Sequence, residues 1–280
     1  MSVSQASGLD GLVPDLTRPH RTAGLAATVL SIAGRTVRKY LRTPELVVFA
    51  FMGSAVFMLL FRYVMAGSIH MGQVRYVDFL VPGFVMTSVL VTGTGVATAV
   101  ADDIEQGVFD RFRSLPVPRI GLALGRVIGD TTIIAVTLAA TAALGFLVGF
   151  HLHGTIAQGL LAYGLCIAFG FAFLWVFACL GLYAGSPQGA QGLSFIAYIP
   201  MFFSSAFVRP ATLPSWARAL AEHQPVTFMV NAVRSLAFGN ASPAGLAHTT
   251  GYWTVWALVW TAGIILVFAP LAARRYRRVD

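Results

Sequence analysis

A stretch of 78 residues without one Asp, Glu, Lys or Arg, residues 131–208, is the feature that most constrains the fold of this chain. One helix needs roughly 20 apolar residues to cross the hydrocarbon core of a bilayer, so this stretch is long enough for three crossings. The composition agrees, because 57% of the 280 residues are hydrophobic and only 11% are charged. Such values are typical of a membrane protein with several spans.

Apolar segments of this length recur along the whole chain, separated by Gly, Pro and polar clusters. They predict six spans, at residues 46–66, 79–101, 131–150, 155–184, 189–208 and 252–273. Each span is expected to be a helix, because backbone groups cannot stay unpaired in lipid, and the alternating pattern of a membrane barrel is absent. We therefore predict an all-α polytopic membrane protein with a six-helix transmembrane domain over residues 45–273.

The distribution of basic residues orients these spans. If both termini are cytoplasmic, the inner segments hold fourteen of the nineteen Lys and Arg residues: Arg18, Arg21, Arg35, Arg38, Lys39, Arg42, Arg111, Arg113, Arg119, Arg126, Arg274, Arg275, Arg277 and Arg278. Cytoplasmic loops of membrane proteins carry such an excess. The loop of residues 102–126 and the basic tail of residues 274–280 are therefore expected in the cytoplasm. Topology thus explains the net positive charge, and we expect no nucleic-acid partner.

The N-terminal region divides into two parts. Residues 1–20 are polar, lack the apolar stretch of a secretion signal, and are expected to be a flexible cytoplasmic tail. Residues 21–44 predict an amphipathic helix whose basic side chains share one arc of a helical wheel, namely Arg21, Arg35, Arg38, Lys39 and Arg42. We expect this helix to lie in the inner headgroup layer against anionic lipid. Packing on a partner is the alternative.

Motifs for catalysis or for metal binding are not found in the sequence. A phosphate-binding loop of the form G-x-x-x-x-G-K-[ST] needs a lysine, and the only lysine, Lys39, lacks the required glycines. We therefore expect no ATPase activity and no cofactor bound by this chain. His151 and His153 have no Glu or Cys nearby, which favours a polar turn over a metal site. Cys166 and Cys179 are expected to be packing or lipid-facing residues.

Ionisable residues within spans usually mark ion pathways, and the predicted spans have none near their centres. Arg126 and Asp130 are four residues apart at the inner start of the third span, where they can pair along the helix. The energy source is therefore expected to act from outside the bilayer, through the polar loop of residues 102–126. This loop must contact a soluble partner. A secondary transporter of a lipophilic compound, driven by an ion gradient, remains the alternative. A lipid-modifying enzyme and a structural anchor are further candidates that no motif supports.

Two separated motifs stand out in the sequence. The first comprises Glu105-Gln106-Gly107, Asp110-Arg111-Phe112, Leu115-Pro116-Val117-Pro118-Arg119 and Gly125-Arg126, and the second Pro214-Ser215-Trp216, Glu222-His223-Gln224-Pro225-Val226-Thr227-Phe228 and Ala232-Val233-Arg234. Both resemble motifs of type-2 ABC exporter permeases, and within these permeases the chain is similar to the daunorubicin-resistance group. Phe112, Pro118 and Val108 depart from the residues usual in the family, which bears on the choice of ATPase partner and leaves the architecture unaffected.

The resemblance implies that a short coupling helix in the loop docks into a cleft on a separate nucleotide-binding subunit, which holds ATP and Mg. Two such subunits would drive a pair of permeases, the second being an identical or a related chain. Apolar residues would fill the cleft and charged residues would orient the loop. The docking set is Asp103, Glu105, Gly107, Phe109, Asp110, Arg111, Phe112, Arg113, Leu115, Pro116 and Arg119. A plain amphipathic connector is the alternative.

Residues 207–239 contain too many prolines for a straight span. The resemblance implies re-entrant half-helices here, with an outer gate that includes Pro214, Trp216, Pro225 and Arg234. For Arg234 we favour a structural tether over a contact with the transported molecule. A path between two copies, lined by Phe, Leu, Thr, Ser and Gly, suits an amphipathic molecule. We therefore predict export of a hydrophobic drug, antibiotic or lipid across the bacterial inner membrane.

Overall fold

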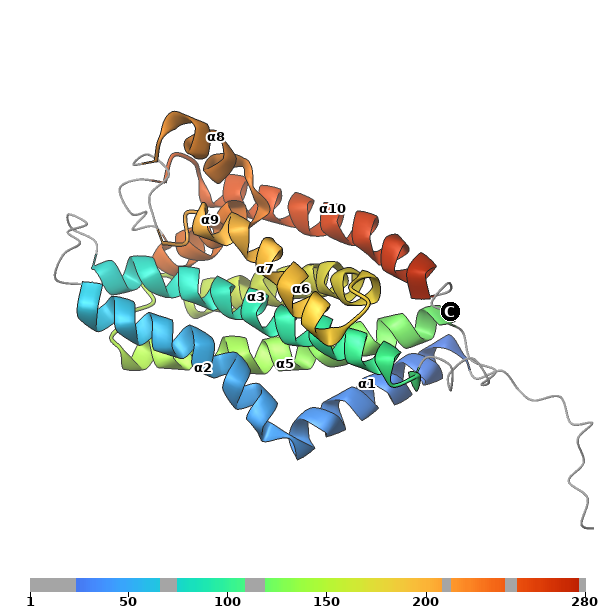
Figure 1. Ribbon diagram of the computed structural model, residues 1–280. Coiled ribbons are helices and arrows are strands. Elements are labelled where there is room, and N and C mark those ends of the chain that lie inside the picture. Colours follow the sequence, from blue (N-terminus) through green and yellow to red (C-terminus); the bar gives the residue numbers. More distant parts are fainter. Residues whose placement is uncertain (1–23, 66–74, 109–118, 208–212, 240–245, 277–280) are drawn as a thin grey trace, which may run out of the picture.

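The structure, a computed structural model, describes residues 24–65, 75–108, 119–207, 213–239 and 246–276, and within these ranges every regular element is helical (Figure 1). The elements are α1 (Leu25–Arg42), α2 (Pro44–Leu60), the π-helical turn η1 (Phe61–Met65), α3 (Tyr76–Glu105), α5 (Arg119–Leu147), α6 (Ile156–Tyr183), α7 (Pro187–Phe202), α8 (Ser215–His223), α9 (Pro225–Phe238) and α10 (Thr250–Tyr276). The predicted all-helical fold is confirmed.

Five segments in the described part of the chain are long and apolar enough to cross a membrane. They are Val47–Val64, Tyr76–Glu105, Ile120–Leu147, Ile156–Tyr183 and Thr250–Tyr276. The second and fourth, on α3 and α6, are buried along most of their length, whereas the first and last, on α2 and α10, have few buried residues. A helix that is apolar on all sides belongs in a protein core or in lipid, so α3 and α6 form the centre of the bundle.

The α6 helix coincides with the predicted span at residues 155–184. Its start is fixed by a capping box, in which the Thr155 hydroxyl accepts a hydrogen bond from the Gln158 N–H at 3.2 Å and the Gln158 side chain accepts one from the Thr155 N–H at 2.8 Å. Both orphan donors at the helix start are thereby satisfied. Ala184 forms the C-cap.

The loop predicted at residues 102–126 is much shorter in the structure. The α3 helix continues to Glu105 and α5 already begins at Arg119, twelve residues before the predicted span. At 1.5 Å rise per residue, α5 is about 43 Å long and exceeds the roughly 30 Å hydrocarbon core. The helices extend further than predicted because charged residues were taken to end a helix, whereas Asp103 and Arg126 pair with each other between α3 and α5.

The fifth predicted span, residues 189–208, was also misplaced. The corresponding helix, α7, begins at Pro187 and ends at Phe202, and its 16 residues are not among the five segments named above. The Ser186 hydroxyl caps its start by accepting a hydrogen bond from the Gly189 N–H at 3.0 Å. Pro200 lies in its last turn and lacks the N–H that would continue the helical ladder, and Phe203 and the following residues form turns.

The α1 helix packs along α5 through closely approaching backbones. A Cβ atom added at Gly125 would lie 2.8 Å from the Val29 carbonyl oxygen, and one added at Gly129 would lie 2.6 Å from Thr36 Cβ. Small residues at four-residue spacing allow such close contact. The amphipathic helix predicted at residues 21–44 thus spans Leu25–Arg42 in the structure and is held to the bundle. Residues 21–23 lie outside the described ranges.

The other side of α1 remains exposed. Its apolar residues Leu30 and Leu41 and the basic residues predicted to face lipid, Arg35, Arg38, Lys39 and Arg42, are all exposed in this chain. One side of the helix therefore packs on α5 and the other is exposed, and contact of the exposed side with lipid or with a partner stays a prediction.

Two short helices, α8 and α9, lie at the end of the bundle opposite the last residues of α10 (Figure 1). Every residue of α9 from Val226 to Phe238 is buried, whereas α8 buries only Ala217 and Ala221. Pro225 separates the two helices and begins α9. Residues 208–212, within the predicted re-entrant region, lie outside the described ranges.

Candidate functional site

A cluster of charged side chains joins three helices at the end of the bundle that holds α1. Arg126 of α5 places its Nε 2.8 Å from Asp130 Oδ2, and its Nη1 pairs with Asp103 Oδ2 of α3. Asp130 is fully buried, with 0% of its side chain exposed. The two residues predicted to be able to pair along the helix are therefore in contact, and Asp103 adds a second carboxylate from a neighbouring helix.

Tyr40 connects α1 to the same cluster. Its hydroxyl donates a hydrogen bond to Asp130 Oδ1 at 2.6 Å. Burial, together with the Asp130 carboxylate, raises the pKa of Tyr40 well above its usual range, so the phenol stays protonated and acts as a donor. The buried Asp130 carboxylate thus receives one bond on each oxygen, which offsets the cost of removing it from water.

Arg126 and Asp130 lie deeper in their helix than predicted. We expected them at the inner start of the third span, but α5 begins at Arg119 and both residues fall within the apolar segment Ile120–Leu147. A buried charge is tolerated when it is paired and hydrogen-bonded. Their depth in the membrane stays a prediction, whereas the partners that stabilise them, Asp103 and Tyr40, come from other helices and were not predicted.

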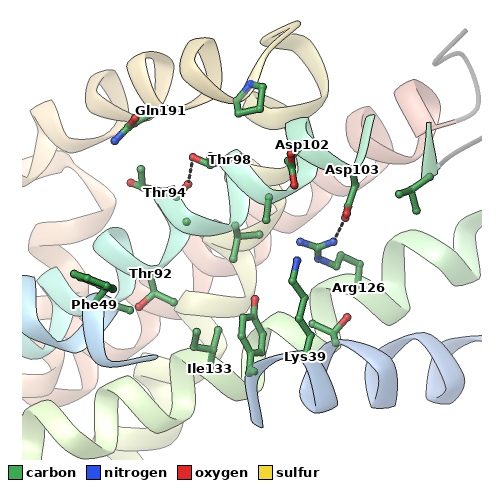
Figure 2. A pocket seen from close by; sticks show the side chains of 18 of the residues that line it. Lys39, Phe49, Thr92, Thr94, Thr98, Asp102, Asp103, Arg126, Ile133 and Gln191 are labelled. Atoms are coloured by element: carbon green, nitrogen blue, oxygen red, sulfur yellow. Dashed lines mark hydrogen bonds and ion pairs between the residues drawn. The ribbon is translucent and has the colours of Figure 1, made fainter. Parts of the chain in front are cut away.

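A cavity of about 760 Å³ opens beside this cluster (Figure 2), within the roughly 300–1,000 Å³ common for ligand pockets. Six helices and their flanking residues line it: Ile32, Arg35, Thr36, Lys39 and Tyr40 from α1; Phe49 and Ala50 from α2; Val91, Thr92, Thr94, Gly95, Val96, Thr98, Ala99, Asp102, Asp103 and Val108 from α3 and its end; Leu122, Arg126 and Ile133 from α5; Pro187, Gln191 and Tyr198 from α7; and Tyr276 from α10.

The hydroxyl groups along the α3 wall of the cavity are engaged within the protein. Thr92 and Thr98 donate to the carbonyl oxygens of Ser88 and Thr94 at 2.8 and 3.0 Å. Thr94 donates to the Tyr198 hydroxyl at 2.9 Å and so links α3 to α7. These threonines consequently contribute few donors to a ligand.

The predicted docking set is only partly described by the structure. Glu105 is exposed at the end of α3, Gly107 has a φ of +65° suited to a glycine after a helix, and Arg119 begins α5. Asp103, assigned to the docking rim, pairs with Arg126 within the bundle. Phe109, Asp110, Arg111, Phe112, Arg113, Leu115 and Pro116, and with them the coupling helix, lie outside the described ranges, so docking stays a prediction.

At the opposite end of the bundle, Arg234 of α9 is almost completely buried, with 2% of its surface exposed. Its Nη2 donates to the carbonyl oxygens of Phe79 and Ser205 at 3.0 and 3.1 Å, and its Nη1 donates to Asn231 Oδ1 at 3.2 Å. The guanidinium carbon also lies 3.7 Å from the centre of the Phe79 ring. These contacts tie α9 to α3 and to the turn after α7, as a structural tether would.

The other residues of the predicted outer gate flank the two short helices. Pro214 precedes α8, Trp216 lies in its first turn, and Pro225 begins α9. Trp216 is exposed and meets the Phe203 ring edge-on at 6.1 Å. A gating role for these residues stays a prediction.

Sequence reasoning missed Asp78, a buried carboxylate in the first turn of α3. Its Oδ2 pairs with Arg75 Nη2 at 3.0 Å, and its Oδ1 accepts a hydrogen bond from the His151 N–H at 3.0 Å. An acidic residue in the first turn of a helix is a recognisable sequence signal, so Asp78 could have been found. Its contact with His151 in the α5–α6 turn could not have been predicted, because the two residues are far apart in the chain.

The two histidines of that turn serve local contacts. His151 Nδ1 lies 2.9 Å from the Gly149 carbonyl oxygen, and His153 stacks on Phe238 with ring centres 5.4 Å apart. Within the ranges that the structure describes, no three His, Cys, Asp or Glu residues form a group that could hold a metal ion. The polar-turn interpretation fits this geometry.

Fold and site together define the class: a multi-pass helical membrane protein whose buried charges connect helices. Comparison with known proteins specifies it further, because a family model described as ABC-2 type transporter matches residues 28–238. The chain therefore belongs to the ABC-2 type transporter family, whose members are transmembrane subunits of ABC transporters.

Two named relatives cover most of the chain. It is 33% identical over 262 residues to the daunorubicin resistance ABC transporter permease protein DrrB1 of Streptomyces coeruleorubidus, covering 93% of this chain and 89% of that protein. It is 26% identical over 235 residues to the probable doxorubicin resistance ABC transporter permease protein DrrC of Mycobacterium tuberculosis (strain CDC 1551 / Oshkosh), covering 81% and 82%. The chain is thus a permease subunit of an ABC transporter.

Proposed function

We propose that this chain is the permease of an ATP-driven exporter that moves a hydrophobic or amphipathic drug, antibiotic or lipid out across the bacterial inner membrane. Family membership and the drug-resistance names of the two relatives support this proposal. ATP and Mg would bind to two copies of a separate nucleotide-binding subunit. Those two copies would act on a pair of permeases, formed by this chain with a second copy or with a related chain.

We infer six crossings, made by α2, α3, α5, α6, α7 and α10, with both termini in the cytoplasm. Two observations support an even number of crossings, because both place the end of α10 at the same end of the bundle as α1. Tyr40 of α1 and Tyr276 of α10 line one cavity, and Arg275 Nε donates to the carbonyl oxygen of Leu182, at the end of α6, at 3.5 Å. The short α7 would complete the count, because Pro187 lines this cavity while Ser205 meets α9 at the other end.

At that other, outer end, α8 and α9 would form the re-entrant half-helices. The complete burial of α9 supports this assignment, because backbone that dips into a membrane without crossing it must be covered by protein.

The observation that carries a coupled, ATP-driven mechanism is the ion pair between Asp103 and Arg126. These residues lie close to the two helix ends that flank residues 106–118, the proposed docking segment. A displacement of that segment would act on α3 and α5 together, because a partly buried ion pair connects them. Tyr40 would extend the displacement to α1 through Asp130.

The decisive experiment is co-purification of the permease with a candidate ATPase subunit, for example one encoded by a neighbouring gene. Phe112→Asp and Leu115→Asp should abolish the complex and ATP-dependent transport, because a charge would enter an apolar cleft. Phe112→Leu, which restores the residue usual in the family, should retain both.

Transport by the permease alone would contradict the proposal. If vesicles containing only this chain moved cargo at full rate, following a proton or sodium gradient, the chain would instead be a secondary transporter. Unchanged binding of the ATPase by both aspartate variants would exclude the assigned docking role.

A further inference from the structure

We propose that the 760 Å³ cavity binds the head of a zwitterionic amphiphile, with its anionic group at Lys39 of α1 and its cationic group at Asp102 of α3. The lining residues alone support binding at this site, whereas a role in binding the exported molecule rests on the function proposed above.

The two walls of the cavity carry opposite charge. Lys39 and Arg35 line it from α1, and Asp102 lines it from α3. Figure 2 shows Lys39 extending from α1, with Asp102 on α3 across the intervening space. Arg126 offers no excess positive charge here, because it is paired with two carboxylates, those of Asp103 and Asp130, and this group is negative by one charge.

Lys39 and Asp102 both keep their charge available to a ligand. Among the residues that the structure describes, no carboxylate lies within 4.0 Å of the Lys39 ammonium. The Asp102 carboxylate accepts a hydrogen bond from the Gln106 amide at 2.9 Å, a neutral donor that leaves the negative charge in place. Two opposite charges are thus held apart across one cavity.

The ligand should also carry an apolar body. Beyond the charged end, the cavity is lined by Phe49 of α2, Val91 of α3 and Ile133 of α5. Phe49 is 76% exposed, so the cavity reaches the apolar outer surface of α2, from which a membrane-dissolved molecule can enter. A small, fully polar zwitterion would make no apolar contacts with these side chains.

A head with a single charge fits this arrangement less well. An anion at Lys39 would leave the Asp102 carboxylate without a cation, and a cation at Asp102 would leave the Lys39 ammonium without an anion. Like charges brought together in a partly desolvated site are unfavourable. A head that carries both charges satisfies both walls at once.

The test measures lipid bound to the purified full-length permease by native mass spectrometry. Three probes with the same two oleoyl chains differ in their heads: phosphoethanolamine is zwitterionic, phosphoglycerol is anionic, and trimethylammonium propane is cationic. We expect the phosphoethanolamine lipid to be retained about tenfold more than either other probe, which corresponds to the loss of one well-placed charge contact. Equal retention of the anionic lipid would overturn the proposal.

Variants identify the two charged positions. Lys39→Met should lower retention of the zwitterionic lipid about fivefold and shift preference toward the cationic probe, and Asp102→Asn should shift it toward the anionic probe. Exchanging the charges, with Lys39→Asp and Asp102→Lys together, should restore zwitterion binding with the head reversed. Failure of this exchange to restore binding while each single variant still folds would overturn the assignment of the two positions.

Matched controls use exposed charges that do not line the cavity, Glu105 on α3 and Arg218 on α8. Glu105→Gln and Arg218→Gln should leave lipid preference unchanged, and an equal effect of these variants would show a nonspecific surface interaction. Because this binding needs no ATPase subunit, it fails or succeeds independently of the docking experiment.

A transported lipid and a permanently bound lipid could share this head chemistry, so a second experiment distinguishes them. In vesicles with the ATPase subunit and ATP, a cargo lipid should move from the inner to the outer leaflet, while a resident lipid should stay bound to the permease. Either outcome supports the binding site, and absence of bound lipid in both states would overturn it.

Discussion

At the scale of single residues, buried charges in this bundle act as connections between helices. Arg126 and Asp130 lie in an apolar stretch of α5 and are compensated by Asp103 and by Tyr40. Arg234 lies at the other end and donates mainly to backbone carbonyl oxygens. The first arrangement joins charged partners on three helices, whereas the second fixes α9 in one position against α3.

A double-mutant cycle on Arg126 and Asp130 should measure this connection. Arg126→Gln leaves the buried Asp130 carboxylate without its cation and should lower the free energy of unfolding by about 3–5 kcal/mol. The double variant Arg126→Gln with Asp130→Asn should recover at least about 1 kcal/mol of this loss, because the two residues interact directly. Unfolding of the purified permease by denaturing detergent gives the free energies.

An exposed pair of the same spacing provides the control. Arg218 and Glu222 of α8 lie 3.6 Å apart with side chains 45% and 48% exposed, and such pairs contribute at most about 1 kcal/mol. Arg218→Gln should therefore change stability little. A loss as large as that of Arg126→Gln would mean that burial is not the cause.

At the scale of elements, the contact between α1 and α5 sets the position of the amphipathic helix. Gly121, Gly125 and Gly129 allow this contact, and an added Cβ at each would lie 3.1 Å or less from an atom of α1. Tyr40 then fixes the register by reaching Asp130. An otherwise mobile surface helix is thereby made part of the bundle, and its basic residues remain exposed.

Gly125→Val should separate α1 from α5. The added side chain would collide with the Val29 carbonyl and with Ile32, and overpacking of this kind costs about 1–3 kcal/mol. The apparent melting temperature of the permease in detergent should fall accordingly. Gly34→Ala, on the same α1 helix but with no atom within 4 Å of the added Cβ, should stabilise the helix by about 0.5–1 kcal/mol and serves as the control.

At the scale of the whole molecule, the two ends of the bundle have different tasks. The end with α1 and the last residues of α10 holds the ion-pair cluster, the cavity and the proposed docking segment. The end with α8 and α9 holds the Arg234 tether and the turn of His151 and His153 (Figure 1). Six crossings would place these two ends on opposite sides of the membrane.

Cysteine labelling in intact cells should establish this orientation. Cys166 and Cys179 are buried, so new cysteines at exposed positions report on access. A membrane-impermeant maleimide should label Glu222→Cys on α8 from outside. Ser31→Cys on α1 and Arg274→Cys on α10 should be labelled only after the cells are opened. Labelling of α1 and α10 from opposite sides would show an odd number of crossings and would exclude α7 as a span.

Much of this architecture was predictable because it depends on local chemistry. Several features can be identified from neighbouring residues in the chain. They are the lipid-length apolar segments, the capping residue Thr155, the break at Pro44 and the four-residue spacing of Arg126 and Asp130. The lengths of α5 and α7 were not predictable, because the helix ends depend on partners from elsewhere. Arg126 is accommodated within α5 by Asp103 and Tyr40, and α7 ends at Phe202, where the turn that follows it packs on α3.

The sequence by itself determined that this chain is a helical membrane protein without a nucleotide-binding loop, because hydrophobicity and motif spacing act over short distances along the chain. Only the tertiary structure decided which polar groups meet. The cluster of Arg126, Asp103, Asp130 and Tyr40, the acceptors of Arg234 and the cavity between Lys39 and Asp102 each combine residues from separate helices. Their geometry follows from how the helices pack, and no local pattern specifies it.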